Sequence, residues 1–313
     1  MQYDIKLSGT PFDDGAIDLD RLELLAQYLH DIAKGALQMR MFGTSARRGK
    51  DTAQITNALK IRLRGLSQGS TVLHLECEPF RKTLQSVQGN LFHQEILRRL
   101  PDQTPMSLIM ESFQDALNPE SNGEMLDKKL LKDLQGFKKV FLNEAHTMQL
   151  SNRGSMPDVE LRLRDFSRLK QIEDTIPKPQ LVMVSGRVEE LKFSKAKVTF
   201  IPDKGRPFTG FLGEDVAPAE MAKFWGQKAT IRGTAHFKPN GTMAYVEIAK
   251  VSLATETDAY FSRTPRRETA AQQIERQLQE GKGRGSTLKR LVDAFADETW
   301  ETSLEEDLQM LRE

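Results

Sequence analysis

The side chains that most often carry catalysis or bind metals are scattered in this chain. The lone cysteine, Cys77, has no base close to it in the sequence, so we expect it to be a small core residue. Asp13 and Asp14 share a turn, where aspartate is favoured for its local backbone hydrogen bonds. No two of the five histidines have the spacing of metal ligands on one helix or hairpin: His30, His74, His93, His146 and His236. The sequence therefore predicts a protein that is not an enzyme and that holds no metal and no cofactor.

The run GKGRGST at residues 281–287 has the glycine content of a phosphate-binding loop. Such loops follow a buried strand, whereas this run follows a polar helical pattern. We interpret it as a hinge.

Basic side chains offer a better lead, because local clusters could contact phosphates even though the chain's net charge is only +1. One cluster lies in the polar loop 42–52 and on the polar face of a predicted hairpin. A second lies within residues 181–253, which contain eleven Lys and Arg but only seven Asp and Glu, with aromatic residues interspersed. That mixture suits single-stranded nucleic acid, but small barrels also need aromatic cores and use lysine to protect strand edges. The candidate nucleic-acid contacts are Arg47, Arg48, Lys50, Arg62, Arg64, Lys192, Lys197 and Arg232.

The C-terminal segment, residues 297–313, is acidic and amphipathic, with seven acidic residues and one basic residue. Ser303 and Glu306 form a capping box for a short helix. A solvating appendage is one interpretation. A segment that folds in the groove of a partner protein is the other, and the spaced leucines and tryptophan favour it. Its candidate partner contacts are Trp300, Leu304, Leu308 and Leu311, flanked by Glu301, Glu305, Glu306 and Asp307.

The elements that must position these side chains are predicted by apolar spacing. In the first half, alternation predicts strands at residues 3–7, 59–64, 71–77 and 158–164, and a three-to-four repeat predicts a helix from Asp18 to Met39. Further helices are predicted from Pro105, with Thr104 as N-cap, from about Leu126 to Phe141, and from Phe166 to Glu173.

The prolines of TIPKPQ, residues 175–180, mark a stiff linker after this half. Beyond it, strands are predicted at 181–193, 197–201, 207–212, 228–237 and 243–253, with a helix at 218–225. We therefore predict an α+β protein with an N-terminal mixed domain over 1–176, a small β-barrel over 181–253, and a helical extension over 254–313.

The order β-β-β-α-β-β of residues 181–253 resembles the OB-fold, a five-stranded Greek-key barrel that often binds oligonucleotides. An SH3-like roll with an inserted helix is the rival interpretation.

The ending WETSLEEDLQMLRE is similar to the C-terminal helices by which antitoxins of bacterial toxin–antitoxin pairs cover the basic active sites of their toxins. It is also similar to the acidic tails of single-stranded DNA-binding proteins, although those end in an apolar residue and this chain ends in Arg312 and Glu313. Neither resemblance extends to the first 180 residues.

Composition excludes two further classes of protein. The single cysteine among 313 residues excludes a disulfide framework, and no apolar run has the length of a membrane span. We expect a cytoplasmic bacterial protein whose acidic tail engages a protein partner, such as a toxin or a defence effector. The alternative is an OB-fold nucleic-acid-binding protein whose acidic tail is autoinhibitory.

Overall fold

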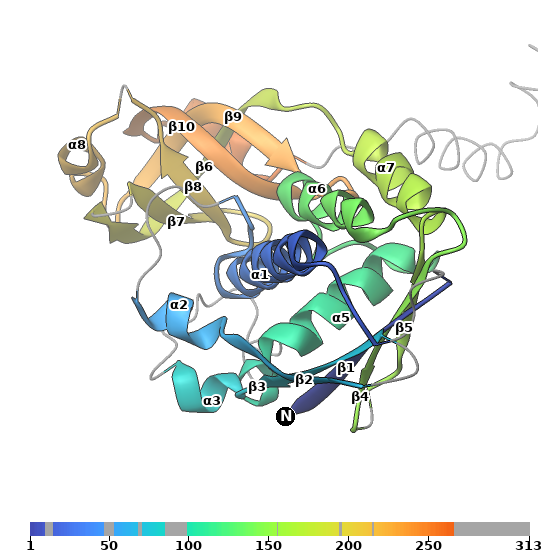
Figure 1. Ribbon diagram of the computed structural model, residues 1–313. Coiled ribbons are helices and arrows are strands. Elements are labelled where there is room, and N and C mark those ends of the chain that lie inside the picture. The colour runs from blue at the N-terminus through green and yellow to red at the C-terminus, as the bar shows by residue number, and fades with distance from the viewer. Residues whose placement is uncertain are drawn as a thin grey trace, which may run out of the picture. The chain divides into compact units, whose positions relative to one another are not determined.

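The computed structural model describes residues 1–9, 15–46, 53–67, 71–84, 99–154, 156–193, 196–214 and 216–265. Within these residues the chain forms two β-structures, an open five-stranded sheet in the first half and a closed five-stranded barrel in the second (Figure 1). The α+β class predicted from the sequence is confirmed.

The open sheet has the strand order β2-β3-β1-β4-β5, and every neighbouring pair is antiparallel. Its strands are β1 (Gln2–Ser8), β2 (Ile61–Ser67), β3 (Thr71–Cys77), β4 (Thr147–Asn152) and β5 (Val159–Arg162). Alternation predicted all of these except β4. In β1, Tyr3, Ile5 and Leu7 are buried, whereas the residues between them lie on the opposite face.

Among the described residues, the helices lie on the face of this sheet that carries the buried residues (Figure 1). The main ones are α1 (Leu19–Phe42), α5 (Pro105–Leu117), α6 (Lys128–Gly136) and α7 (Asp165–Thr175). Shorter elements are α2 (Ala53–Ala58), α3 (Phe80–Thr83), η1 (Leu100–Asp102) and η2 (Phe137–Val140). The predicted helix 126–141 is therefore two elements, because α6 ends at Gly136 and a 3₁₀ turn follows.

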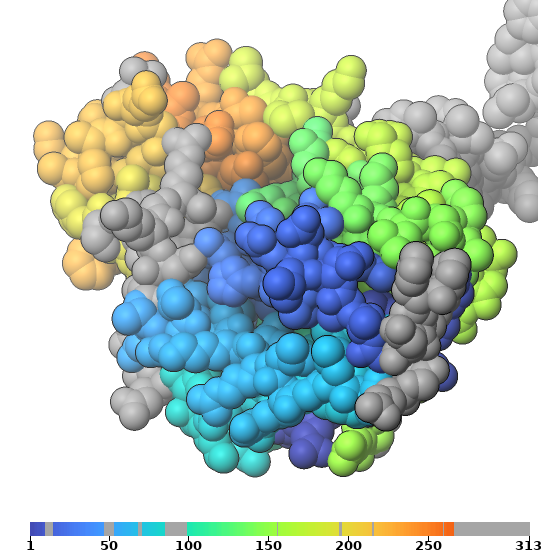
Figure 2. Space-filling model, viewed as in Figure 1, coloured from blue at the N-terminus to red at the C-terminus, as the bar shows by residue number. Residues whose placement is uncertain are grey.

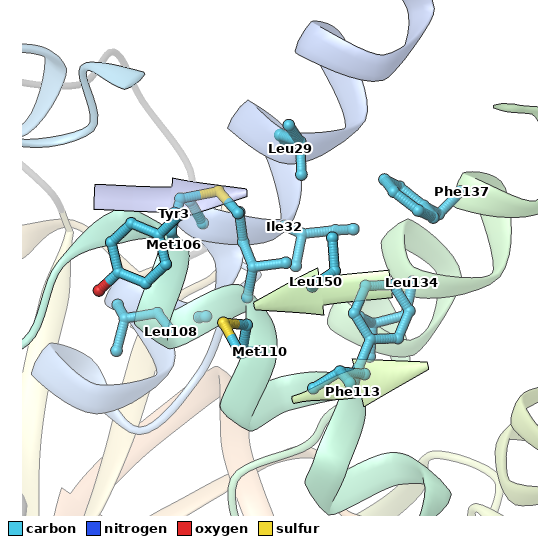
Figure 3. Close-up of a cluster of buried hydrophobic side chains, with 14 of the residues drawn as sticks. Tyr3, Leu29, Ile32, Met106, Leu108, Met110, Phe113, Leu134, Phe137 and Leu150 are labelled. Atoms are coloured by element: carbon cyan, nitrogen blue, oxygen red, sulfur yellow. The ribbon is translucent and has the colours of Figure 1, made fainter. Parts of the chain in front are cut away.

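Side chains from the helices and the sheet form one apolar core. Figure 3 shows Ile32 of α1, Phe113 of α5, Leu134 of α6 and Leu150 of β4 converging there. Thr104 caps α5 as predicted, since its hydroxyl accepts a hydrogen bond from the backbone N–H of Ser107 at 3.1 Å.

The barrel consists of β6 (Gln180–Lys192), β7 (Lys197–Pro202), β8 (Phe208–Leu212), β9 (Lys228–Phe237) and β10 (Met243–Leu253), with helix α8 (Pro218–Ala222) before β9. It closes in the order β10-β8-β7-β6-β9, and β8 and β10 pair in parallel. This closed mixed barrel is compatible with the OB-like barrel that the sequence predicts.

Helix α8 is shorter than the predicted helix 218–225. Met221 is fully buried, whereas Trp225, beyond the end of the helix, is 67% exposed. Gly226 has a φ of 70°, but it lies four residues beyond the end of α8 and is therefore not its C-cap.

The end of α1 packs against the outer face of β7 and β8. The hydroxyl of Thr209 donates a hydrogen bond to the Phe42 carbonyl at 3.0 Å, and the Lys238 ammonium donates to the Glu124 carbonyl at 2.9 Å. Every residue of β8 is buried, and in β7 only Ile201 is partly exposed. The two halves of the described chain are thus in direct contact.

Of the predicted extension 254–313, the described part contains only the 3₁₀ helix η4 (Glu256–Phe261). None of the described helices combines the length and apolar character needed to cross a lipid bilayer.

Candidate functional site

The candidate site is an apolar groove on the helix-covered side of β2, which is an edge strand. Helix α1 and strand β2 form its two sides, and their surfaces lie next to each other in Figure 2. Its cavity volume is about 350 Å³. The lining residues that the argument uses are Leu22, Leu29, His30, Lys60, Ile61 and Leu63.

The groove exists because the sheet extends past its helix layer. Leu63 lies opposite Leu75, on the face that the helices cover, yet Leu63 is 43% exposed whereas Leu75 is 6% exposed. Leu66, further along β2, is 44% exposed. Edge strands with exposed apolar side chains are surfaces that bind other chains, and this one is interrupted by a register shift between Leu63 and Gly65.

The electrostatic character of the groove is mildly basic. Lys60 and His30 line it, and no carboxylate belongs to the described lining. Lys60 also lines a second, more polar cavity of about 270 Å³, together with Arg62, Glu76 and Glu78.

The arginines of β2 lie on its exposed surface, but Arg64 is engaged by an acid. Its guanidinium forms an ion pair with the Glu76 carboxylate across the hairpin. Hydrogen bonding to Arg64 lowers the pKa of Glu76, which favours the ionised form of this carboxyl. A phosphate would have to compete with Glu76 for Arg64.

The basic residues proposed on the barrel belong to a different β-structure from these arginines. Lys192 forms an ion pair with Glu190 at 3.0 Å, and Arg232 is exposed in β9. Lys197 is only 5% exposed, because it lies in the contact with α1. Arg47, Arg48 and Lys50 fall outside the described residues.

The barrel aromatics are mainly core. Phe200, Phe208 and Phe237 belong to the buried barrel core, and Phe211 is 8% exposed beside Tyr245. Phe193, by contrast, is 55% exposed. A core role therefore accounts for most of the aromatic residues that the sequence left open as stacking platforms.

All eight candidate partner contacts of the tail lie outside the described residues: Trp300, Glu301, Leu304, Glu305, Glu306, Asp307, Leu308 and Leu311. The groove itself was missed by sequence analysis. Its only sequence signal is Leu63, an apolar residue between two arginines, and that pattern is also typical of an ordinary half-buried strand.

Among the described residues, no group of three or more His, Cys, Asp or Glu side chains is arranged to hold a metal ion. Cys77 is 1% exposed, and desolvation by burial raises its pKa to about 12. Its thiol is therefore a core group, as the sequence predicts.

The chain was compared with protein-family models, with curated proteins and with solved structures, and it matches none of them.

Proposed function

We propose that this protein acts by binding another protein, and that its acidic C-terminal segment, residues 297–313, makes one of the contacts. Trp300 and the three leucines of this segment would enter an apolar groove of the partner, while its acidic side chains pair with Lys or Arg there. The resemblance to antitoxin helices makes a basic toxin or defence effector the class of partner that we expect.

The observation that carries this proposal is the open apolar groove between α1 and β2. Contiguous apolar surface that remains exposed on a folded chain is typical of protein–protein contacts. With Lys60 and His30 in its lining and no carboxylate among the described lining residues, the groove suits a partner helix whose apolar face is flanked by acids. The partner would thus be held at two places, by the groove and by the tail.

Nucleic-acid binding by the barrel is the second candidate. If the barrel is an OB-fold, β7 and β8 are its second and third strands, and their outer face is where such barrels bind oligonucleotides. In this chain the residues of that face are buried, and Thr209 and Lys197 contact Phe42 at the end of α1. Exposed Arg232 and Phe193 lie outside that contact and support the second candidate, which would use another part of the barrel surface.

The test begins with affinity capture from the source cells, using the full chain and a chain that ends at Ala296. A captured protein is then produced in pure form and titrated calorimetrically against both chains and against Leu63→Glu. Leu181→Glu is the matched control, because Leu181 is an apolar residue on a barrel strand and is 72% exposed. We expect the truncation and Leu63→Glu each to weaken binding at least tenfold, about 1.4 kcal/mol, and the control to bind normally.

Equal affinity of the full and truncated chains for every captured protein would overturn the role of the tail. Binding of a single-stranded oligonucleotide that falls steeply between about 50 and 200 mM salt would favour the second candidate. That candidate further requires the binding to weaken in Arg232→Ala and to strengthen when the tail is removed.

A further inference from the structure

Three side chains on the uncovered face of the open sheet form a connected hydrogen-bonded row. Asp4 of β1, His74 of β3 and Ser67 of β2 come from three adjacent strands. The Asp4 Oδ1 atom is 2.7 Å from His74 Nδ1, and His74 Nε2 is 2.5 Å from Ser67 Oγ. A carboxylate, an imidazole and a hydroxyl are thus connected in the order that activates a serine nucleophile.

The strand register holds this row in place. Asp4 and His74 are directly paired across β1 and β3, so both side chains leave the sheet on the same face. Ser67 is paired with Val72, two residues before His74 on the same strand and face. The arrangement therefore follows from backbone pairing.

The hydrogen bonds that His74 makes with Asp4 and Ser67 determine which tautomer its neutral ring adopts. A carboxylate accepts hydrogen bonds and does not donate them, so Asp4 selects the tautomer that carries its proton on Nδ1. The lone pair of Nε2 then faces the Ser67 hydroxyl, which donates to it. This is the state in which a histidine acts as a general base.

Solvent reaches the row from the side opposite the helices. The side chains of His74 and Asp4 are 34% and 27% exposed, and neither of the two cavities near β2 is lined by these residues. An open face suits small acyl groups with a good leaving group and does not select a large substrate. Lys6 is an exposed cation of β1 that pairs with Val72, the residue opposite Ser67, so its Cα is expected about 10 Å from that of Ser67.

We propose that Asp4, His74 and Ser67 form an acyl-transfer site that cleaves small activated esters. The Ser67 oxygen attacks the ester carbonyl carbon while its proton moves to His74 Nε2. The carbon–oxygen bond to the leaving group then breaks, and the leaving alcohol takes that proton from His74. Water, deprotonated by His74, next attacks the acyl-serine, which releases the carboxylic acid and restores the Ser67 hydroxyl. Lys6 supplies positive charge near the oxyanion. Asp4 stabilises the His74 imidazolium that forms during acylation and again during deacylation.

The test treats the purified full chain with a fluorophosphonate probe and identifies the labelled residue by peptide mass spectrometry. In parallel, release of p-nitrophenol from p-nitrophenyl acetate is followed. Ser67→Ala should abolish labelling and the enzyme-dependent release, and Asp4→Asn should slow both at least tenfold while circular dichroism stays unchanged. Ser151→Ala is the matched control, because Ser151 lies opposite Asp4 on the other neighbouring strand, β4, and it should behave like the parent chain.

Absence of phosphonate label on Ser67 in the folded parent chain would overturn the proposal. Ester cleavage that persists in Ser67→Ala would do the same, since it would identify direct attack by another side chain. Labelling of Ser67 at an unchanged rate in Asp4→Asn would show that the carboxylate does not orient His74. None of these outcomes depends on the protein partner, so this inference and the proposed binding function fail separately.

Discussion

The ammonium nitrogen of Lys197 lies 4.6 Å from the centroid of the Phe42 ring. Lys197 begins β7 and Phe42 ends α1, so this cation–π contact joins the barrel to the helix that spans the N-terminal core. Together with the hydrogen bond from Thr209 to the Phe42 carbonyl, it places the end of α1 on the barrel face of β7 and β8. The sequence suggests Lys197 as a phosphate contact, but in the structure it packs inside the molecule.

Buried hydrogen bonds to Asp127 also stabilise the fold. It is 3% exposed, caps α6 through the Leu130 N–H at 3.0 Å, and accepts hydrogen bonds from Thr44 and Ser45. We predict that Asp127→Ala lowers the free energy of unfolding by about 3 kcal/mol, because it leaves several buried donors unpaired. Urea unfolding measures this. Asp174→Ala is the control, since its ion pair with Lys170 is on the surface and contributes little; equal effects of the two substitutions would contradict the prediction.

Gly186 is required by a close backbone approach inside the barrel. A Cβ atom at this position would lie 2.1 Å from the Ile201 carbonyl oxygen on the neighbouring strand. We predict that Gly186→Ala costs about 3 kcal/mol or more, because backbone must move to make room. Gly65→Ala in β2 is the matched control, since its added Cβ would have no neighbour within 4 Å, and its thermal midpoint should stay within a few degrees of the parent. A Gly186→Ala protein as stable as Gly65→Ala would contradict this, because it would show that the barrel backbone moves at little cost to accommodate the added methyl group.

The Cys77 thiol should resist alkylation while the protein is folded. Burial raises its pKa to about 12, so almost none of it is thiolate at pH 8, and reagents reach it only when the chain opens. We predict that iodoacetamide labels the folded protein at least a hundredfold more slowly than it labels the chain in denaturant. The two rates are compared by mass spectrometry of the intact protein, and similar rates would place Cys77 in contact with solvent.

Asp115 should make the stability depend on pH. Desolvation raises its pKa above the ordinary 3.8, despite the hydrogen bond from Ser121. The folded state therefore binds a proton more tightly than the unfolded state does, and stability decreases as pH rises from 3.8 through the raised pKa. We predict that Asp115→Asn is more stable relative to the parent at pH 7 than at pH 4, as measured by urea midpoints at both values. A pH-independent difference between the two proteins would contradict this.

The individual elements of both halves could be predicted because their signals are local. Alternation in QYDIKLS and the cap Thr104-Pro105 each reflect the period of one strand or the end of one helix, and the structure confirms them. Strand β4, TMQLSN, was missed because it carries only two buried residues, Met148 and Leu150, which give too short an alternation. The barrel strands were predicted nearly to the residue, since turns such as Pro239-Asn240-Gly241 separate them.

The sequence by itself determined most of the strands and helices, the β-β-β-α-β-β succession of residues 181–253, and the core role of Cys77, because these signals come from side chains close together along the chain. Only the tertiary structure decided that Lys197 packs on Phe42, that Leu63 borders a groove, and that Asp4, His74 and Ser67 form one row. Those relationships depend on strand register and on which helix covers which face. Both are set by the free energy of burying the whole core, to which residues distant in sequence contribute together.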